Sequence, residues 1–125
     1  MGAMSETQPF ADHLGITVDD TTVRVTTTER HANVSGTVHG GLIATLVDMA
    51  MGRTVRAQLD DDASAATLQL SLTYLNPAEP GDTLIATAEI GKRGKAVVLL
   101  SAEVVTDDGR DIAEAVGTFT ITSAG

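Results

Sequence analysis

The chain has no cysteine and few aromatic residues. Its 125 residues include no Trp, one Tyr and two Phe. The absence of cysteine excludes disulfides, thiolate metal sites and a cysteine nucleophile, and it makes a cytoplasmic location the expectation. The core has to be built from aliphatic side chains. Because a core of that kind is lean, burial of further surface in an oligomer would stabilise the domain.

Positive charge and long apolar runs are also scarce. Eight Lys and Arg residues stand against 17 Asp and Glu residues, a net charge of −9. We therefore expect no binding to nucleic acid or to an anionic membrane, since both need a basic surface. No apolar run is long enough for a membrane span, and no signal-peptide pattern is found. We expect residues 5–125 to form one domain and residues 1–4 to be an expression remnant or a disordered start.

The pattern of apolar residues predicts two helices and five strands. The helices are expected at 6–14 and 40–59, and the strands at 17–28, 65–75, 83–90, 96–106 and 112–122. In the strand at 65–75, Leu68, Leu70, Leu72 and Tyr74 alternate with Thr67, Gln69, Ser71 and Thr73, so the two sets should face opposite sides of a sheet. Successive hairpins predict a mostly antiparallel sheet whose concave face one long helix can fill, an α+β domain.

One carboxylate lies inside the most hydrophobic helix of the chain. Residues 40–52 are apolar almost all round, which is typical of a buried helix, yet Asp48 lies among them. The neighbours on its face include no cation: Ala44, Thr45, Met51 and Gly52. Removal from water without a counter-ion would make this carboxylate a stronger base. The alternative is an Asp satisfied by an interface partner or a bound water.

A polar segment with several glycines leads into this helix. Residues 33–41 read Asn-Val-Ser-Gly-Thr-Val-His-Gly-Gly. Free backbone N–H groups and the positive end of the helix dipole both favour negative charge at a helix N-terminus. Because Gly40 and Gly41 have no Cβ, a ligand should be able to approach the backbone after His39. The helix is therefore expected to offer both an oxyanion site and a carboxylate.

These two features cannot act on one substrate within a single chain. Nine residues of helix separate His39 from Asp48, about 13 Å at the usual helical rise. A reacting carbonyl and its attacking water have to lie roughly 3 to 4 Å apart. Two such helices, antiparallel across a twofold axis, would place each N-terminus beside the partner's carboxylate. If the two groups cooperate, the spacing predicts an obligate homodimer with two equivalent sites.

Three of the eight basic residues surround one glycine. Lys92, Arg93 and Lys95 flank Gly94 in a predicted hairpin turn. In an acidic protein such a turn is a candidate binding site for an anionic ligand such as a nucleotide phosphate. An ordinary charged hairpin turn is the alternative.

Several motifs follow one another in order between about residues 14 and 121. They are Asn33-x-x-Gly36-Thr37-x-His39-Gly40-Gly41, Leu46-x-Asp48, Leu72-Thr73-Tyr74-Leu75-x-Pro77-Ala78, Gly81-Asp82-Thr83-Leu84 and Gly94-Lys95. In this order they resemble the hotdog-fold acyl-CoA thioesterases of the phenylacetic-acid-degradation (PaaI-like) branch of the 4-hydroxybenzoyl-CoA thioesterase superfamily. The resemblance implies an antiparallel sheet wrapped around a long central helix.

The resemblance also implies an activity and a set of site residues. The activity would be hydrolysis of an acyl-CoA thioester to a free acid and coenzyme A, without metal or cofactor. Asp48 would be the general base or the nucleophile, and Thr67 falls at the position of a water-orienting Ser or Thr. The backbone N–H of Gly40 would polarise the thioester carbonyl, with Asn33 assisting on the same side. In the family, one subunit supplies the Asn and Gly and its partner supplies the Asp and the hydroxyl; a homotetramer built as a dimer of dimers is also expected.

Other residues take secondary roles in this interpretation. Arg93, Gly94 and Lys95 would contact the phosphates of CoA. His39 is a candidate base, although a His at the start of a helix more often fixes a loop through hydrogen bonds. A metal site built from His31, His39 and Asp48 lacks a recognisable ligand spacing and is rejected.

Two other functions stay open at this point. One is a hotdog hydratase or dehydratase for enoyl or hydroxyacyl thioesters, whose Asp-x-x-x-x-His spacing this chain lacks. The other is a noncatalytic acyl-CoA-binding protein, which would not need Asp48 and Thr67. The acyl group is not predicted, because aliphatic linings accept aryl groups as well as medium or long chains.

Overall fold

The computed structural model describes residues 8–123, so the expected remnant at 1–4 and the predicted helix start at Glu6 lie outside the described residues. The elements in chain order are α1 (Pro9–Leu14), β1 (Thr17–Asp19), β2 (Thr22–Thr26), η1 (Glu29–His31), α2 (Gly40–Arg56), β3 (Ala63–Tyr74), β4 (Thr83–Arg93), β5 (Val97–Thr106) and β6 (Asp111–Ser123). No helix within 8–123 has the length and apolar character needed to cross a membrane.

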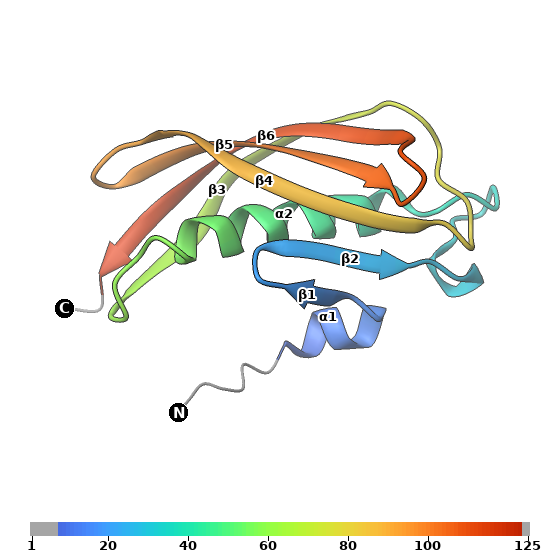
Figure 1. Ribbon diagram of the computed structural model, residues 1–125, viewed down its shortest axis with the longest axis horizontal. Helices are drawn as coiled ribbons and strands as arrows, with labels where there is room; N and C mark the ends of the chain where they lie inside the picture. The colour runs from blue at the N-terminus through green and yellow to red at the C-terminus, as the bar shows by residue number, and fades with distance from the viewer. Residues whose placement is uncertain (1–7, 124–125) are drawn as a thin grey trace.

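The strands form one six-stranded sheet in the order β1-β2-β4-β5-β6-β3, with every pair antiparallel. The sheet curves over one side of α2 (Figure 1). The loops before α2 and between β3 and β4 lie at one end of the sheet, and the β4–β5 hairpin lies at the other, where α2 ends (Figure 1). The predicted antiparallel sheet around one long helix is confirmed.

The core lies between α2 and the concave face of the sheet. The buried residues of the helix are Leu42, Ile43, Leu46, Val47, Ala50, Met51, Gly52 and Val55. Strand β5 shows the expected alternation, with Val98, Leu100, Ala102 and Val104 buried against the helix. Phe119 is fully buried, whereas Phe10 and Tyr74 are 65% and 52% exposed. The core is therefore aliphatic with a single aromatic ring, as the composition predicts.

The predicted strand at 17–28 is two strands joined by a tight turn. Asp19 pairs with Thr22, and Asp20 between them adopts a positive φ of 60°. Aspartate tolerates this left-handed conformation better than most residues do. The run of Val and Thr predicts extended structure correctly, but it does not reveal the turn.

A β-bulge in β3 changes which face its side chains occupy. The pairing with β6 shifts between Thr67, which lies opposite Phe119, and Gln69, which lies opposite Thr118. Because one extra residue inverts the alternation, Thr67 faces α2 together with Leu70 and Tyr74. The prediction that Thr67 points away from these residues is therefore wrong, and Leu68 at the bulge is 59% exposed.

Helix α2 and strand β4 each end three residues away from the predicted position. Helix α2 ends at Arg56 and not at residue 59, and β4 continues to Arg93, so the basic turn is shorter than expected. Gly94 closes that turn by donating its N–H to the Val97 carbonyl at 2.8 Å. The turn between β5 and β6 contains the pair Asp108-Gly109, which is typical of tight hairpin turns, with Gly109 at a φ of 93°.

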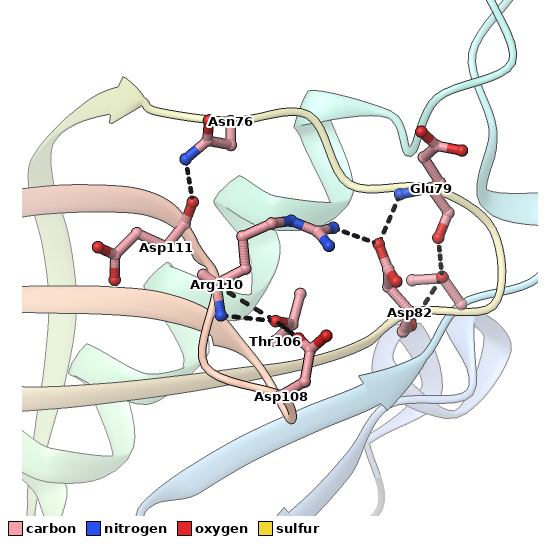
Figure 2. Close-up of polar contacts among 8 residues, drawn as sticks. Asn76, Glu79, Asp82, Thr106, Asp108, Arg110 and Asp111 are labelled. Carbon is pink, nitrogen blue, oxygen red and sulfur yellow. Dashed lines mark hydrogen bonds and ion pairs between the residues drawn. The ribbon is translucent and has the colours of Figure 1, made fainter.

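A polar cluster ties the β3–β4 loop to the β5–β6 hairpin at the end where α2 begins (Figure 2). The Asp82 carboxylate accepts the Glu79 N–H at 2.9 Å and the Arg110 guanidinium at 2.7 Å. These contacts hold the pKa of the Asp82 carboxyl below its ordinary value, with the Glu79 N–H as the largest cause. The same loop accepts the Val38 N–H at the Ala78 carbonyl, 2.8 Å away, and so supports the segment that leads into α2.

Candidate active site

The start of α2 is capped by the histidine that precedes it. His39 has an extended backbone, with φ −62° and ψ 131°, and its Nδ1 accepts the Gly41 N–H at 2.8 Å. A side-chain acceptor at this position satisfies one of the free N–H groups of the first helical turn. This contact fits the prediction that His39 fixes the chain at the helix start.

Tyr74 lies on the first residue of the helix. Its hydroxyl donates to the Gly40 carbonyl at 2.9 Å. Together with Val38, Ile43 and neighbouring residues of the β3–β4 loop, these two residues line a cavity of about 470 Å³ at the helix start. The alternation in β3 assigned Tyr74 only to an apolar face, so sequence reasoning missed this contact. The feature of the sequence that could have indicated a role for Tyr74 is its place in the Leu72-Thr73-Tyr74-Leu75-x-Pro77-Ala78 motif.

Asn33 shapes the loop that leads to the helix. Its Oδ1 accepts the N–H groups of Ser35 and Thr37 at 2.9 and 3.2 Å, and its Nδ2 donates to the Thr37 hydroxyl at 2.9 Å. These contacts use one of the two hydrogens on the amide nitrogen, so the other can donate to a further group. The side chain is therefore held in place and keeps a single donor for another group.

Asp48 and Thr67 form the second pair of site residues. The Thr67 hydroxyl donates to Asp48 Oδ1 at 2.6 Å. Asp48 is half-buried, and Thr67 is exposed. The expectation that this carboxylate is buried within its own chain is wrong, because the sheet covers only one side of α2. Half-exposed positions one turn apart continue along the uncovered side, at Ala44 and Thr45.

One cationic side chain folds back along the helix onto the turn that follows Asp48. A Cβ added to Gly52 would lie 3.2 Å from an amino nitrogen of Arg56 and 3.5 Å from the ring of Phe119. The Arg56 guanidinium therefore lies over Gly52, one turn beyond Asp48. Arg56 is two turns from Asp48 in the sequence, and so a search of the adjacent turn for a cation missed it. In the sequence, Gly52 between them could have indicated that another side chain packs on this turn.

The basic turn joins β4 to β5 at the end of the sheet where α2 ends (Figure 1). Arg93 pairs with Val98, Val98 pairs with Phe119, and Phe119 pairs with Thr67. Paired residues of neighbouring strands share a face, so Arg93 and Thr67 lie on the helix side of the sheet in one lateral row. Arg93 of the predicted CoA-contacting turn is therefore in register with Thr67, the residue that binds Asp48.

The sequence-predicted site residues form two groups along α2. Asn33, His39 and Gly40 lie at its start, and Asp48 with Thr67 lies eight residues further, about 12 Å along the helix axis. Hydrogen bonds join Asp48 to Thr67, and they fix Asn33 and His39 within the segment that leads into the helix; no side-chain hydrogen bond among residues 8–123 joins the two groups. No group of three or more potential metal-ligating His, Asp or Glu side chains forms within the described part of the chain.

Both ring nitrogens of His31 have backbone partners. Its Nδ1 accepts the Thr28 N–H at 3.0 Å, and its Nε2 lies 2.7 Å from the Leu14 carbonyl. The rejected metal site would have needed one of these nitrogens. His31 instead joins the short helix η1 to the end of α1.

Comparison with known proteins identifies close relatives. Residues 35–113 match the family described as the thioesterase superfamily. The chain is 39% identical over 80 residues to acyl-coenzyme A thioesterase 13 of Mus musculus, a match that covers 61% of this chain and 54% of that protein. The chain therefore spans about half the length of this relative. It is 32% identical over 117 residues to acyl-coenzyme A thioesterase PaaI of Escherichia coli, covering 89% of this chain and 81% of that protein.

A solved structure has the same arrangement of helix and sheet. A Bacillus halodurans protein, crystallised with CoA, is 34% identical and superimposes with a TM-score of 0.86. The match covers 93% of this chain and 77% of the Bacillus halodurans chain. This likeness confirms the hotdog fold.

Proposed function

The chain belongs to the thioesterase superfamily, and on that premise we propose that it hydrolyses the thioester bond of an acyl-CoA, releasing a carboxylic acid and CoA. The observation that carries the proposal is the hydrogen bond from Thr67 to Asp48 on the open side of α2. It holds a carboxylate where a small molecule can reach it, which is what a general base needs. Relatives named as acyl-CoA thioesterases and a similar structure with CoA support the substrate class.

Asp48 activates the water in this mechanism. Thr67 binds Oδ1, so Oδ2 remains to accept a proton from a water molecule. The Thr67 oxygen keeps lone pairs that can accept the second hydrogen of that water, which orients its oxygen toward the thioester. The water oxygen attacks the carbonyl carbon as its proton passes to Asp48, and a tetrahedral intermediate forms.

The start of α2 stabilises the negative charge on that intermediate. The carbonyl oxygen binds the Gly40 N–H at the positive end of the helix, with the remaining amide hydrogen of Asn33 on the same side. When the intermediate collapses, the C–S bond breaks and the proton held by Asp48 passes to the CoA thiolate. The products are a free acid and CoA, and Asp48 returns to its ionised form.

A second copy of the chain completes each site. Gly40 and Asp48 are too far apart on one helix to act on one carbonyl, so Gly40 of one copy works with Asp48 of the other. Strand β3 supports this assembly, because its 12 residues form an open edge of the sheet. A long open edge is usually covered in natural proteins. Antiparallel pairing of two β3 strands about a twofold axis would bring the open sides of two α2 helices together.

The remaining parts of the proposal concern CoA and higher assembly. Arg93, Gly94 and Lys95 contact the CoA phosphates, which the acidic surface elsewhere would repel.

Two dimers associate through the outer face of the sheet into a homotetramer. Exposed apolar residues on that face support such a contact: Val97, Leu99 and Val116.

A panel of acyl-CoAs assayed with a thiol reagent tests the proposed activity. We expect release of free thiol with an equal amount of carboxylic acid from at least one aryl, medium-chain or long-chain substrate. Hydration of an enoyl-CoA without thiol release would instead identify a hydratase. Tight acyl-CoA binding with no turnover across the panel would identify a binding protein. Either result would overturn the proposal.

A further inference from the structure

Helix α2 begins with two residues that have a low helix propensity. Glycine is the poorest helix former after proline, and Gly40 and Gly41 occupy the first two helical positions. Helix ends fray readily. A first turn made of two glycines would therefore give a poorly directed N–H, unless other groups hold it.

Two aromatic rings occupy the space that the glycines leave open. A Cβ on Gly40 would lie 3.2 Å from the Tyr74 hydroxyl oxygen and 3.3 Å from Cζ of the same ring. A Cβ on Gly41 would lie 2.9 Å from Nδ1 of His39. The expectation from the sequence was that the missing Cβ atoms make room for a ligand. In the structure, side chains of the protein fill that room.

The two rings hold one peptide group from both ends. Tyr74 donates to the Gly40 carbonyl, and His39 accepts the Gly41 N–H, and these two groups belong to the same peptide unit. A peptide unit is planar, so hydrogen bonds at its oxygen and at its N–H together fix its orientation. The N–H of Gly40 belongs to the preceding peptide unit, whose His39 carbonyl accepts the Leu42 N–H at 3.0 Å. This Gly40 N–H has no acceptor among residues 8–123.

We propose that Tyr74 is a positioning residue for the hydrolysis: with His39 it holds the Gly40–Gly41 peptide and so directs the free Gly40 N–H at the thioester oxygen. The inference rests on the proposed function. Tyr74 makes no contact with the reacting atoms. It acts through the backbone, and the effect of losing it should appear in the rate of the chemical step more than in substrate binding.

The variant Tyr74→Phe removes the hydroxyl and keeps the ring. We expect kcat to fall about fivefold, the scale of one lost hydrogen bond, with KM changed less than about twofold. Thr73→Val is the matched control, since it removes a hydroxyl from the adjacent, outward-facing residue of the same strand. It should leave kcat unchanged. An unchanged kcat in folded Tyr74→Phe would overturn the inference.

Amide exchange gives a readout that needs no substrate. In Tyr74→Phe the Gly41 N–H should exchange with solvent at least several-fold faster than in the wild type, while amides of the β5–β6 pair keep their rates. Equal exchange at Gly41 in both proteins would contradict the inference. This measurement separates failure of the inference from failure of the proposed function, which the wild-type panel alone decides.

His39 provides a second test if Tyr74→Phe does not fold. Asparagine caps helices through a side-chain oxygen, whereas alanine offers no acceptor. We expect His39→Asn to keep about fivefold more of the wild-type kcat than His39→Ala. Equal losses in the two variants would mean that the imidazole itself acts in the reaction, and the positioning role would be rejected.

Discussion

The start and the middle of α2 differ in how many contacts within one chain hold their site side chains in place. At the start, Asn33, His39 and Tyr74 each bind backbone or loop groups, so the side chains are fixed before any substrate arrives. In the middle, Asp48 has one side-chain partner, Thr67, and faces an uncovered surface. A donor for developing charge has to be rigid, whereas a base has to be reached by water and substrate. In the proposed shared site, the uncovered middle of α2 is the surface that faces the second copy.

The largest expected effect is at the middle of the helix. Asp48→Asn keeps the size of the side chain and its hydrogen bond with Thr67 but removes the base. We expect kcat to fall about a thousandfold, with the oligomeric state unchanged in sedimentation. A folded Asp48→Asn protein with near wild-type turnover would show that the carboxylate is not the base.

The next effect separates the Gly40 N–H from the shape of Gly40. Gly40→Pro removes the N–H at a position where helices accept proline, and the extended backbone of His39 suits a following proline. We expect kcat to fall at least about a hundredfold. Gly40→Ala is the matched control, because it adds the same Cβ near Tyr74 but keeps the N–H. If the two variants lose the same activity, the effect is steric and the N–H is not an oxyanion donor.

The partner of Asp48 should have a smaller effect. Thr67→Val keeps the shape of the side chain but cannot bind Asp48 Oδ1, and we expect a loss of about tenfold in kcat. Thr67→Ser restores a hydroxyl and should recover most of that loss. Recovery is the informative result, because a purely structural role at the bulge would make Ser no better than Val.

The smallest effect concerns the polar cluster that supports the start of the helix. The depressed pKa of Asp82 contributes stability above the ordinary aspartate pKa of about 3.9, and that contribution disappears as the pH falls through the lower folded pKa. Asp82→Asn should lower the free energy of unfolding at pH 7 by about 1 kcal/mol or less. Denaturant titrations at pH 7 and at about pH 3 should show the difference shrinking in acid. A difference that grows in acid would contradict this assignment.

Part of the fold follows from patterns that one strand or helix determines by itself. The alternation in residues 96–106 predicts β5, and the apolar run after His39 predicts where α2 begins. The bulge at Leu68 could not be predicted, because it depends on the register between β3 and β6. For the same reason the face of Thr67 was assigned wrongly, although the family resemblance placed the residue at the position of a water-orienting Ser or Thr.

The candidate site shows the same limit. His39, Gly40 and Asp48 stand out because their residue types are unusual for their positions in a helix. Tyr74 and Arg56 do not stand out, since a Tyr in an alternating strand and an Arg near a helix end are ordinary. Their contacts with Gly40 and Gly52 arise only when distant segments meet or when a side chain folds back. The burial of Asp48 was misjudged because the composition of a helix does not say how many of its sides the sheet covers.

Co-expression of two inactive variants tests most directly whether each site is shared between two chains. Random pairing of equal amounts of Asp48→Asn and Gly40→Pro chains gives mixed dimers in half of the cases. Each mixed dimer has one site free of substitutions, so activity should return to about a quarter of the wild-type value. Pairing Asp48→Asn with Thr67→Val is the control, since both changes lie in the same half and no unaltered site forms. Activity of the first mixture no higher than the average of its two parents would contradict the shared site.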